Sequence, residues 1–316
     1  MRLIINPEID YVWLDKSTLQ VTFQNGHSIQ INELPLETQK IFTRLDGITS
    51  ISQIFIEFGI DERIHSEIQE SFSFLIKNRI LINQNIMHQK FENLKNSYIQ
   101  VLGLNTLAYQ ISHLLAAAGV GRIVLEDLSG SQNLISLGDI NCFGPKAKEI
   151  GTSLSKSIKQ SISYFDAKID RPKNQVNPDL VVICKDLKEY ELNEILHKKI
   201  VHVFVNKIGD NINVGPFVIP ENQTCTRCQS VFNLKNKIRS LIAVKSNFRE
   251  LDKNPTLTTL ASSLVATNVV SFLSKELIDQ NPSLLNMVCE LNPVGPEITF
   301  KNLMKKNVCT CKWDAA

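Results

Sequence analysis

The sequence predicts an α/β protein, with a doubly wound, mainly parallel sheet preceded by a small winged-helix-like α+β domain. From Ser97 onward, apolar runs typical of strands alternate with helical runs, whereas the residues before Gln84 form strands first and helices afterwards. The 316 residues also exceed the usual size of a single core, which favours two domains. We therefore expect domains at 1–84 and 97–316, joined by a polar, helix-capable linker at 85–96.

Composition excludes several classes of protein. Hydrophobic residues make up 43% of the chain and charged residues 21%, as in ordinary globular proteins. The net charge of +2 favours neither nucleic acid nor an anionic membrane as a partner. No apolar run approaches the ~18 residues needed to span a bilayer. We expect Cys142, Cys184 and Cys289 to be ordinary core thiols. With no signal-peptide pattern, a reducing cytoplasm is the expected location.

The first domain begins with three predicted strands. They cover residues 11–14, 18–23 and 28–31, and Asn25-Gly26 is a strong hairpin signal because both residues tolerate positive φ. Helices are predicted at 37–45, 50–58 and 62–78, with Ser50 as an N-cap, and a closing strand at 80–82. Three strands and three helices of this length indicate a winged-helix-like module.

Winged helices commonly bind DNA through a basic recognition helix. The predicted third helix instead mixes acidic and basic residues, which favours a peptide-binding variant. An extended peptide would add to the edge formed by Ser28, Ile29, Gln30, Ile31 and Asn32. The expected groove wall on the third helix is His65, Gln69 and Phe72. The alternative is that the chain's own loop caps this edge.

The second domain opens with a strand at 98–103, a helix at 107–118 and a strand at 122–127 that ends in an acid. This is how a nucleotide-binding sheet begins. Further core strands are predicted at 179–184 and 201–205. The turn after the first strand keeps only its first glycine, Gly103, since Asn105 and Thr106 stand where further glycines would let the backbone approach a phosphate. ATP is therefore expected to bind poorly.

Two cysteine pairs predict a structural zinc site. Cys225 and Cys228 form a C-x-x-C pair, and Cys309 and Cys311 form a C-x-C pair near the end of the sequence. Four thiolates fill a tetrahedral zinc site and leave no position open for water. The alternatives are disulfides or free surface thiols, and the expected cytoplasm disfavours the disulfides.

The second domain resembles the ThiF-like adenylating superfamily, relatives of the ubiquitin-activating enzymes. The resemblance covers residues 97–316. Its marks are the helix-to-strand junction at 115–123, the acid Asp127, the Gly144-Pro145-Lys146-Ala147 segment, Asp186 and the two cysteine pairs.

The departures from that family bear on activity. Ser129 replaces its second acid, and residues 131–138 contain no arginine. Charge that develops on phosphate during adenylation would have little to stabilise it. The resemblance therefore implies no catalytic residues and a vestigial nucleotide site made of Gly103, Asn105, Asp127, Lys146 and Asp186.

One branch of the superfamily, the ocin-ThiF-like proteins of thiazole/oxazole-modified peptide biosynthesis, is similar in three respects. Its members have an N-terminal peptide-recognition module, a degenerate adenylation site, and a segment like 214–220 that leads to a C-x-x-C. The resemblance implies a non-catalytic subunit that binds the leader of a ribosomal precursor peptide, such as a bacteriocin or thiopeptide precursor. It would present the peptide to a YcaO-type cyclodehydratase that uses the ATP.

The resemblance also allows a flavin-dependent azoline dehydrogenase as a further partner, and a homodimer. Two alternatives stay open at this point. One is an active peptide-adenylating enzyme that uses Asp127, Lys146 and Asp186. The other is a winged-helix transcriptional regulator, against which the weakly charged third helix counts.

Overall fold

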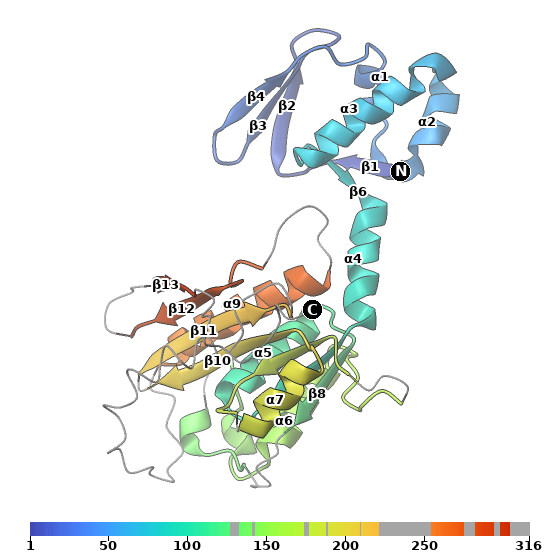
Figure 1. The fold of residues 1–316 in the computed structure, drawn as a ribbon. Helices are drawn as coiled ribbons and strands as arrows, with labels where there is room; N and C mark the ends of the chain where they lie inside the picture. The colour runs from blue at the N-terminus through green and yellow to red at the C-terminus, as the bar shows by residue number, and fades with distance from the viewer. Residues whose placement is uncertain are drawn as a thin grey trace. The chain divides into compact units, whose positions relative to one another are not determined.

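The computed structural model describes residues 1–126, 133–140, 143–173, 177–187, 189–208, 210–220, 254–274, 282–293 and 298–303 (Figure 1). The chain divides into two compact units, residues 1–90 and residues 91–316. The fold class predicted from the sequence is confirmed. The second unit is an α/β domain with a central sheet whose first strands are parallel, and the first is a small domain rich in antiparallel strands.

The N-terminal unit contains two antiparallel three-stranded sheets, in the orders β5-β1-β6 and β2-β3-β4. The strands are β1 (Arg2–Ile5), β2 (Ile9–Trp13), β3 (Leu19–Phe23), β4 (Ser28–Ile31), β5 (Asp46–Ser50) and β6 (Leu81–Asn83). The helices are α1 (Thr38–Phe42), α2 (Ile51–Phe58) and α3 (His65–Lys77), with a 3-10 turn at Glu62–Ile64.

Local signals in the sequence located most of these elements. Ser50 is the N-cap of α2 as predicted, since its side chain accepts a hydrogen bond from the backbone N–H of Gln53, which bonds back to complete a capping box. The predicted helix 37–45 was too long, because the chain turns after Phe42 and enters β5. Strands β1 and β5 were missed altogether.

Phe42 lies at the centre of the first unit's core. Its ring centroid is 5.3 Å from that of Trp13, 5.9 Å from that of Tyr11 and 6.5 Å from that of Phe72. Phe72 is fully buried. Edge-to-face aromatic packing of this kind stabilises beyond the area it buries. The aromatic cluster therefore joins β2, α1 and α3 into one structure.

In the second unit, the described residues form a seven-stranded sheet in the order β13-β12-β11-β10-β9-β7-β8. Strands β8, β7, β9 and β10 are parallel neighbours, and β11 to β13 are added antiparallel. The strands are β7 (Tyr98–Leu102), β8 (Arg122–Glu126), β9 (Leu180–Ile183), β10 (His202–Ile208), β11 (Asn211–Val218), β12 (Met287–Leu291) and β13 (Ile298–Asn302).

Helices cover both faces of this sheet. They are α5 (Thr106–Ala117), α6 (Leu154–Ser163), α7 (Glu189–His197) and α9 (Pro255–Leu273), visible in Figure 1. Alternate residues of β9 belong to different cores: Leu180 and Val182 lie in the large cluster with α5, α6 and α9, whereas Val181 and Ile183 pack with Ile195 of α7. Burial on both sides explains why this strand is apolar throughout, as a central parallel strand is.

The predicted linker forms a helix, α4 (Gln84–Asn96), and the division between the two units falls within it. Its last turn belongs to the second unit. Leu94 is buried, and its carbonyl oxygen accepts a hydrogen bond of 2.9 Å from the N–H of Gly121. The side-chain amide of Asn93 donates to the carbonyl oxygen of Ser274 at 3.2 Å.

Helix α9 is the one described helix that is long and apolar enough, by length and composition, to cross a membrane. Ala261, Val265 and Val269 on α9 are fully buried, and the helix packs against α5. This packing is that of a core helix.

Candidate functional site

Strand β4 is an edge of its sheet. Within residues 1–90 its single strand neighbour is β3, so no loop of the N-terminal unit pairs with the outer edge. Residues 24–27 connect β3 to β4, and the predicted hairpin signal Asn25-Gly26 lies in this connection. Gly26 has φ of +78°, and its N–H donates to Phe23 O at 2.8 Å. The N–H of Phe23 donates to His27 O at 2.9 Å, so these two residues form a hydrogen-bonded pair.

This pair fixes which backbone groups of β4 face outward. Hydrogen-bonded and non-hydrogen-bonded pairs alternate along an antiparallel ladder. Ile29 and Ile31, opposite Val21 and Leu19, therefore use their N–H and C=O groups toward β3. The backbone groups of Ser28 and Gln30 point away from the sheet. An incoming strand would bond to these two residues.

The side chains of β4 alternate as the sequence predicted. Ser28 and Gln30 are exposed, whereas Ile29 and Ile31 are half-buried and pack against the core. Asn32, which follows the strand, is exposed. The predicted edge is therefore present, with polar side chains on one face and apolar side chains on the other.

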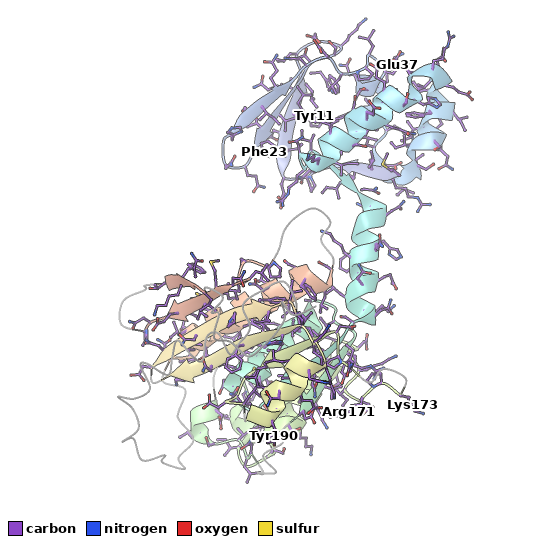
Figure 2. The ribbon with its side chains drawn as sticks, viewed as in Figure 1. Tyr11, Phe23, Glu37, Arg171, Lys173 and Tyr190 are labelled. Carbon is purple, nitrogen blue, oxygen red and sulfur yellow. The ribbon has the colours of Figure 1, made fainter. Side chains whose placement is uncertain are left out.

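The predicted groove wall needs correction. Phe72 is fully buried beside Phe42, so it belongs to the core and cannot contact a peptide. His65 faces α2: its ring lies 4.3 Å from that of Phe55, and its Nε2 lies 3.1 Å from Ile60 O. Gln69 is exposed one turn further along the same side of α3, and its predicted role stays a prediction. Figure 2 shows the opposite edge of this sheet, with Tyr11 on β2.

The second candidate site lies at the carboxyl ends of β7, β8 and β9. Gly103 follows β7 with φ of +104°, and a Cβ there would lie 3.0 Å from Lys185 Cβ and 3.1 Å from the carbonyl carbon and oxygen of Cys184. Both the conformation and the space require glycine at this position. The sequence therefore located the glycine turn after the first parallel strand correctly.

Asn105 occupies the N-terminus of α5. Its side-chain oxygen accepts a hydrogen bond from the N–H of Ala108 at 2.9 Å, and its Nδ2 donates to Cys184 O at 2.6 Å. The helix N-terminus is where a phosphate would bind in such a fold. One of the N–H groups that would receive it is already bonded to the chain's own amide.

Ion pairs hold the acids of this edge in place. Glu126, the last residue of β8, accepts a hydrogen bond from Gln100 and lies 2.7 Å from Arg171 Nη2. Lys185, which follows β9, pairs with the buried Glu191 of α7 at 2.8 Å. Figure 2 labels Arg171, which pairs with the last residue of β8, and Tyr190 at the start of α7. Glu126 and Arg171 are far apart in the sequence, so no local pattern signals their pairing, whereas Lys185 and Glu191 are six residues apart.

Of the remaining predicted nucleotide residues, the structure describes Lys146 and Asp186. Asp186 is exposed after β9. Lys146 precedes a 3-10 turn (Ala147–Glu149), and its N–H donates to Glu149 Oε2 at 2.6 Å. Burial and the charge of Lys146 lower the pKa of His113, in the middle of α5. Asp127 and Cys142 lie outside the described residues, as do the predicted zinc ligands Cys225, Cys228, Cys309 and Cys311.

Two cysteines of the second unit are core residues, as predicted. Cys184 and Cys289 are free thiols and are buried. Burial raises the pKa of both, most strongly that of Cys184 at the end of β9. A thiol that stays protonated is a poor nucleophile, so Cys184 is unsuited to carry a covalent intermediate despite its place beside Gly103.

Comparisons with known proteins identify the fold. No family model matches the chain, and no curated protein matches its sequence. The structure is similar to that of E. coli MccB solved with ATP, with a TM-score of 0.68 and 17% identity, covering 98% of this chain and 99% of MccB. MccB, the microcin C7 biosynthetic enzyme, in complex with N-formylated MccA gives a TM-score of 0.68 at 18% identity and the same coverage.

A third structure, that of PaaA, gives a TM-score of 0.59 and 14% identity, covering 82% of this chain and 98% of PaaA. At these identities the likeness establishes the fold. The chain has the architecture of MccB along its whole length, with both the small N-terminal unit and the α/β unit.

Proposed function

We propose that this protein binds the leader of a ribosomally made precursor peptide along β4 and presents it for modification by a separate enzyme. The observation that carries the proposal is the unpaired edge of β4 within residues 1–90, where Ser28 and Gln30 offer outward backbone groups beside the half-buried Ile29 and Ile31. β-Strand addition is a common way to recognise an extended peptide. The similarity to MccB, solved in complex with MccA, supports the same use of the fold.

The separate enzyme in this proposal is a YcaO-type cyclodehydratase, which would use the ATP and form thiazolines or oxazolines. A flavin-dependent dehydrogenase acting afterwards fits the same scheme. The local structure around Gly103 supports a non-catalytic role, because Asn105 caps α5 and both Glu126 and Lys185 are engaged in ion pairs. Polar groups that are already bonded to one another do little to stabilise the charge that develops on a reacting phosphate.

An adenylating enzyme is the second candidate, and one observation favours it: MccB, similar along its whole length, has been solved with ATP. We expect the isolated protein to show no ATP–pyrophosphate exchange above background in the presence of a precursor peptide. A clear exchange rate that is lost in Asp186→Ala or Lys146→Ala would establish the second candidate instead. Weak nucleotide binding alone would not, since a helix N-terminus attracts phosphate without supporting chemistry.

Substitution of Gln30 tests the peptide edge. Gln30→Pro removes one outward N–H from β4, and we expect leader binding by the full chain to weaken about tenfold, as the loss of one net hydrogen bond of ~1 kcal/mol and local strain would give. Gln30→Ala keeps the N–H and is the matched control. Fluorescence anisotropy with a labelled leader measures both.

The two variants also separate backbone from side-chain recognition. Equal affinities for wild type and Gln30→Pro would place the peptide elsewhere. Proline at Ile29, by contrast, removes an N–H that faces β3, so this variant should damage the sheet itself and serves as a folding control.

Zinc remains part of the proposal. If Cys225, Cys228, Cys309 and Cys311 share one ion, elemental analysis should find about one zinc per chain, as a four-thiolate site requires. Cys309→Ser should lower both the zinc content and the solubility, because metal binding contributes to folding. Full zinc content in a variant that lacks both cysteine pairs would refute the site.

A further inference from the structure

The outer face of the β3–β4 hairpin is uncharged. Residues 17–32 contain no Asp, Glu, Lys or Arg. On the outer face, Gln20 lies opposite Gln30 and Thr22 lies opposite Ser28. The hydroxyl groups of Thr22 and Ser28 are 2.9 Å apart and share a hydrogen bond. The side-chain amide of Gln30 donates to Asn32 Oδ1 at 2.9 Å. We call the exposed polar row of Ser28, Gln30 and Asn32 the neutral row.

The inner face of the same strand is apolar. Ile29 and Ile31 stay half-buried although they pack against the core, so each leaves part of its side chain uncovered at the edge. A strand that pairs with β4 places alternate side chains on the two faces. One set would lie beside the neutral row, and the other would lie beside the two isoleucines.

The other edge of the sheet, β2, has a different character. Asp10 is exposed on β2, and the carboxylates of Glu8 and Asp15 flank the strand. A hydrogen bond from the N–H of Ser17 lowers the pKa of Asp15, so this group stays ionised near neutral pH. Residues 8–15 contain no Lys or Arg, and Lys16 follows directly after them. A basic segment would be attracted to this edge, and its binding would weaken as salt is added.

We infer that the segment bound by β4 alternates apolar residues with uncharged polar residues, namely Ser, Thr, Asn or Gln. The inference rests on the proposed function, since it specifies the class of peptide for that edge. Directly opposed hydroxyl and amide side chains on neighbouring strands stabilise pairing. A charged side chain in the same place would lie over the neutral row without an ionic partner and would lose part of its hydration. Salt should therefore have little effect on binding to β4.

Three synthetic peptides test this with the full chain. Each carries a fluorophore and a six-residue segment in which isoleucine alternates with a second residue, flanked by Gly-Ser for solubility. The second residue is Thr and Gln in the first peptide, Lys in the second and Glu in the third. Anisotropy titrations are run at 50 mM and 300 mM salt with wild type, Gln30→Pro and Gln30→Ala. The salt series distinguishes β4 from the acidic β2 edge.

The neutral peptide is expected to bind about tenfold more tightly than either charged peptide at 300 mM salt, to change less than about twofold between the two salt concentrations, and to weaken in Gln30→Pro. Equal or tighter binding of a charged peptide that is still weakened by Gln30→Pro would overturn the inferred class and leave the edge intact. If all three peptides bound and Gln30→Pro changed none of their affinities, β4 would not be the binding edge, and the proposed function would be overturned with it. No binding by any peptide would likewise overturn the inferred class.

Discussion

Replacing Phe72 with alanine is expected to lower the free energy of unfolding of the N-terminal unit by about 3–5 kcal/mol, the usual cost of removing a buried aromatic ring. Phe72 is fully buried in the core, and its ring centroid lies 6.5 Å from that of Phe42. Because small domains are stable by only about 5–15 kcal/mol, much of the unit's stability would be lost. Leader binding should fall with it. Urea unfolding followed by circular dichroism measures the change.

The chain offers a matched control on the same helix. Phe74, two residues later, is 51% exposed. Phe74→Ala should therefore change the stability by no more than about 0.5 kcal/mol, as surface substitutions usually do. A similar loss for both variants would contradict the packing described for α3.

Gly121→Ala is expected to destabilise the second unit by about 3 kcal/mol or more, at or above the upper end of the usual cost of overpacking. A Cβ at Gly121 would lie 1.7 Å from the carbonyl oxygen of Lys95, which is backbone and cannot rotate away. The N–H of Gly121 also donates to Leu94 O, so any shift breaks the contact between α4 and the start of β8. The melting temperature of the full chain reports the effect.

Gly119→Ala is the control for the general effect of replacing a glycine in this turn. Gly119 has φ of +95°, yet a Cβ there would meet no atom within 4 Å. Its replacement should cost about 1–2 kcal/mol, from backbone strain alone. If Gly121→Ala lowered the melting temperature no more than Gly119→Ala, the result would contradict the close packing of Lys95 O against Gly121.

Sequence patterns predicted those helices, strands and caps that depend on interactions between neighbouring residues. The alternation in Ser28–Ile31, the cap at Ser50 and the apolar run before Gly103 each correspond to an observed element. Strands β1 and β5 were missed because each is short and pairs with a partner far away in the sequence: Arg2 opposes Ser50, and Ile5 opposes Leu81. Such pairing leaves no periodic pattern within a few residues.

The candidate sites show the same division. Gly103 and Asn105 could be located from the sequence because the turn after the first parallel strand is stereotyped in this class of sheet. The pair of Glu126 with Arg171 could not, since the two residues are far apart in the sequence and meet only in the folded chain. Phe72 was misplaced although it recurs at helical spacing with Ile68 and Leu75, both fully buried. Its place in that apolar stripe indicated that its side chain would be buried in the core.

Hydrogen exchange of the full chain with and without a leader peptide tests the central claim most directly. The account predicts that the backbone amides of Ser28 and Gln30, which face outward from β4, become protected when the peptide binds, because they donate to the added strand. The amides of Ile29 and Ile31 already face β3 and should change much less. Protection confined to residues 97–316, with Ser28 and Gln30 unchanged, would show that the peptide binds elsewhere and would contradict the account.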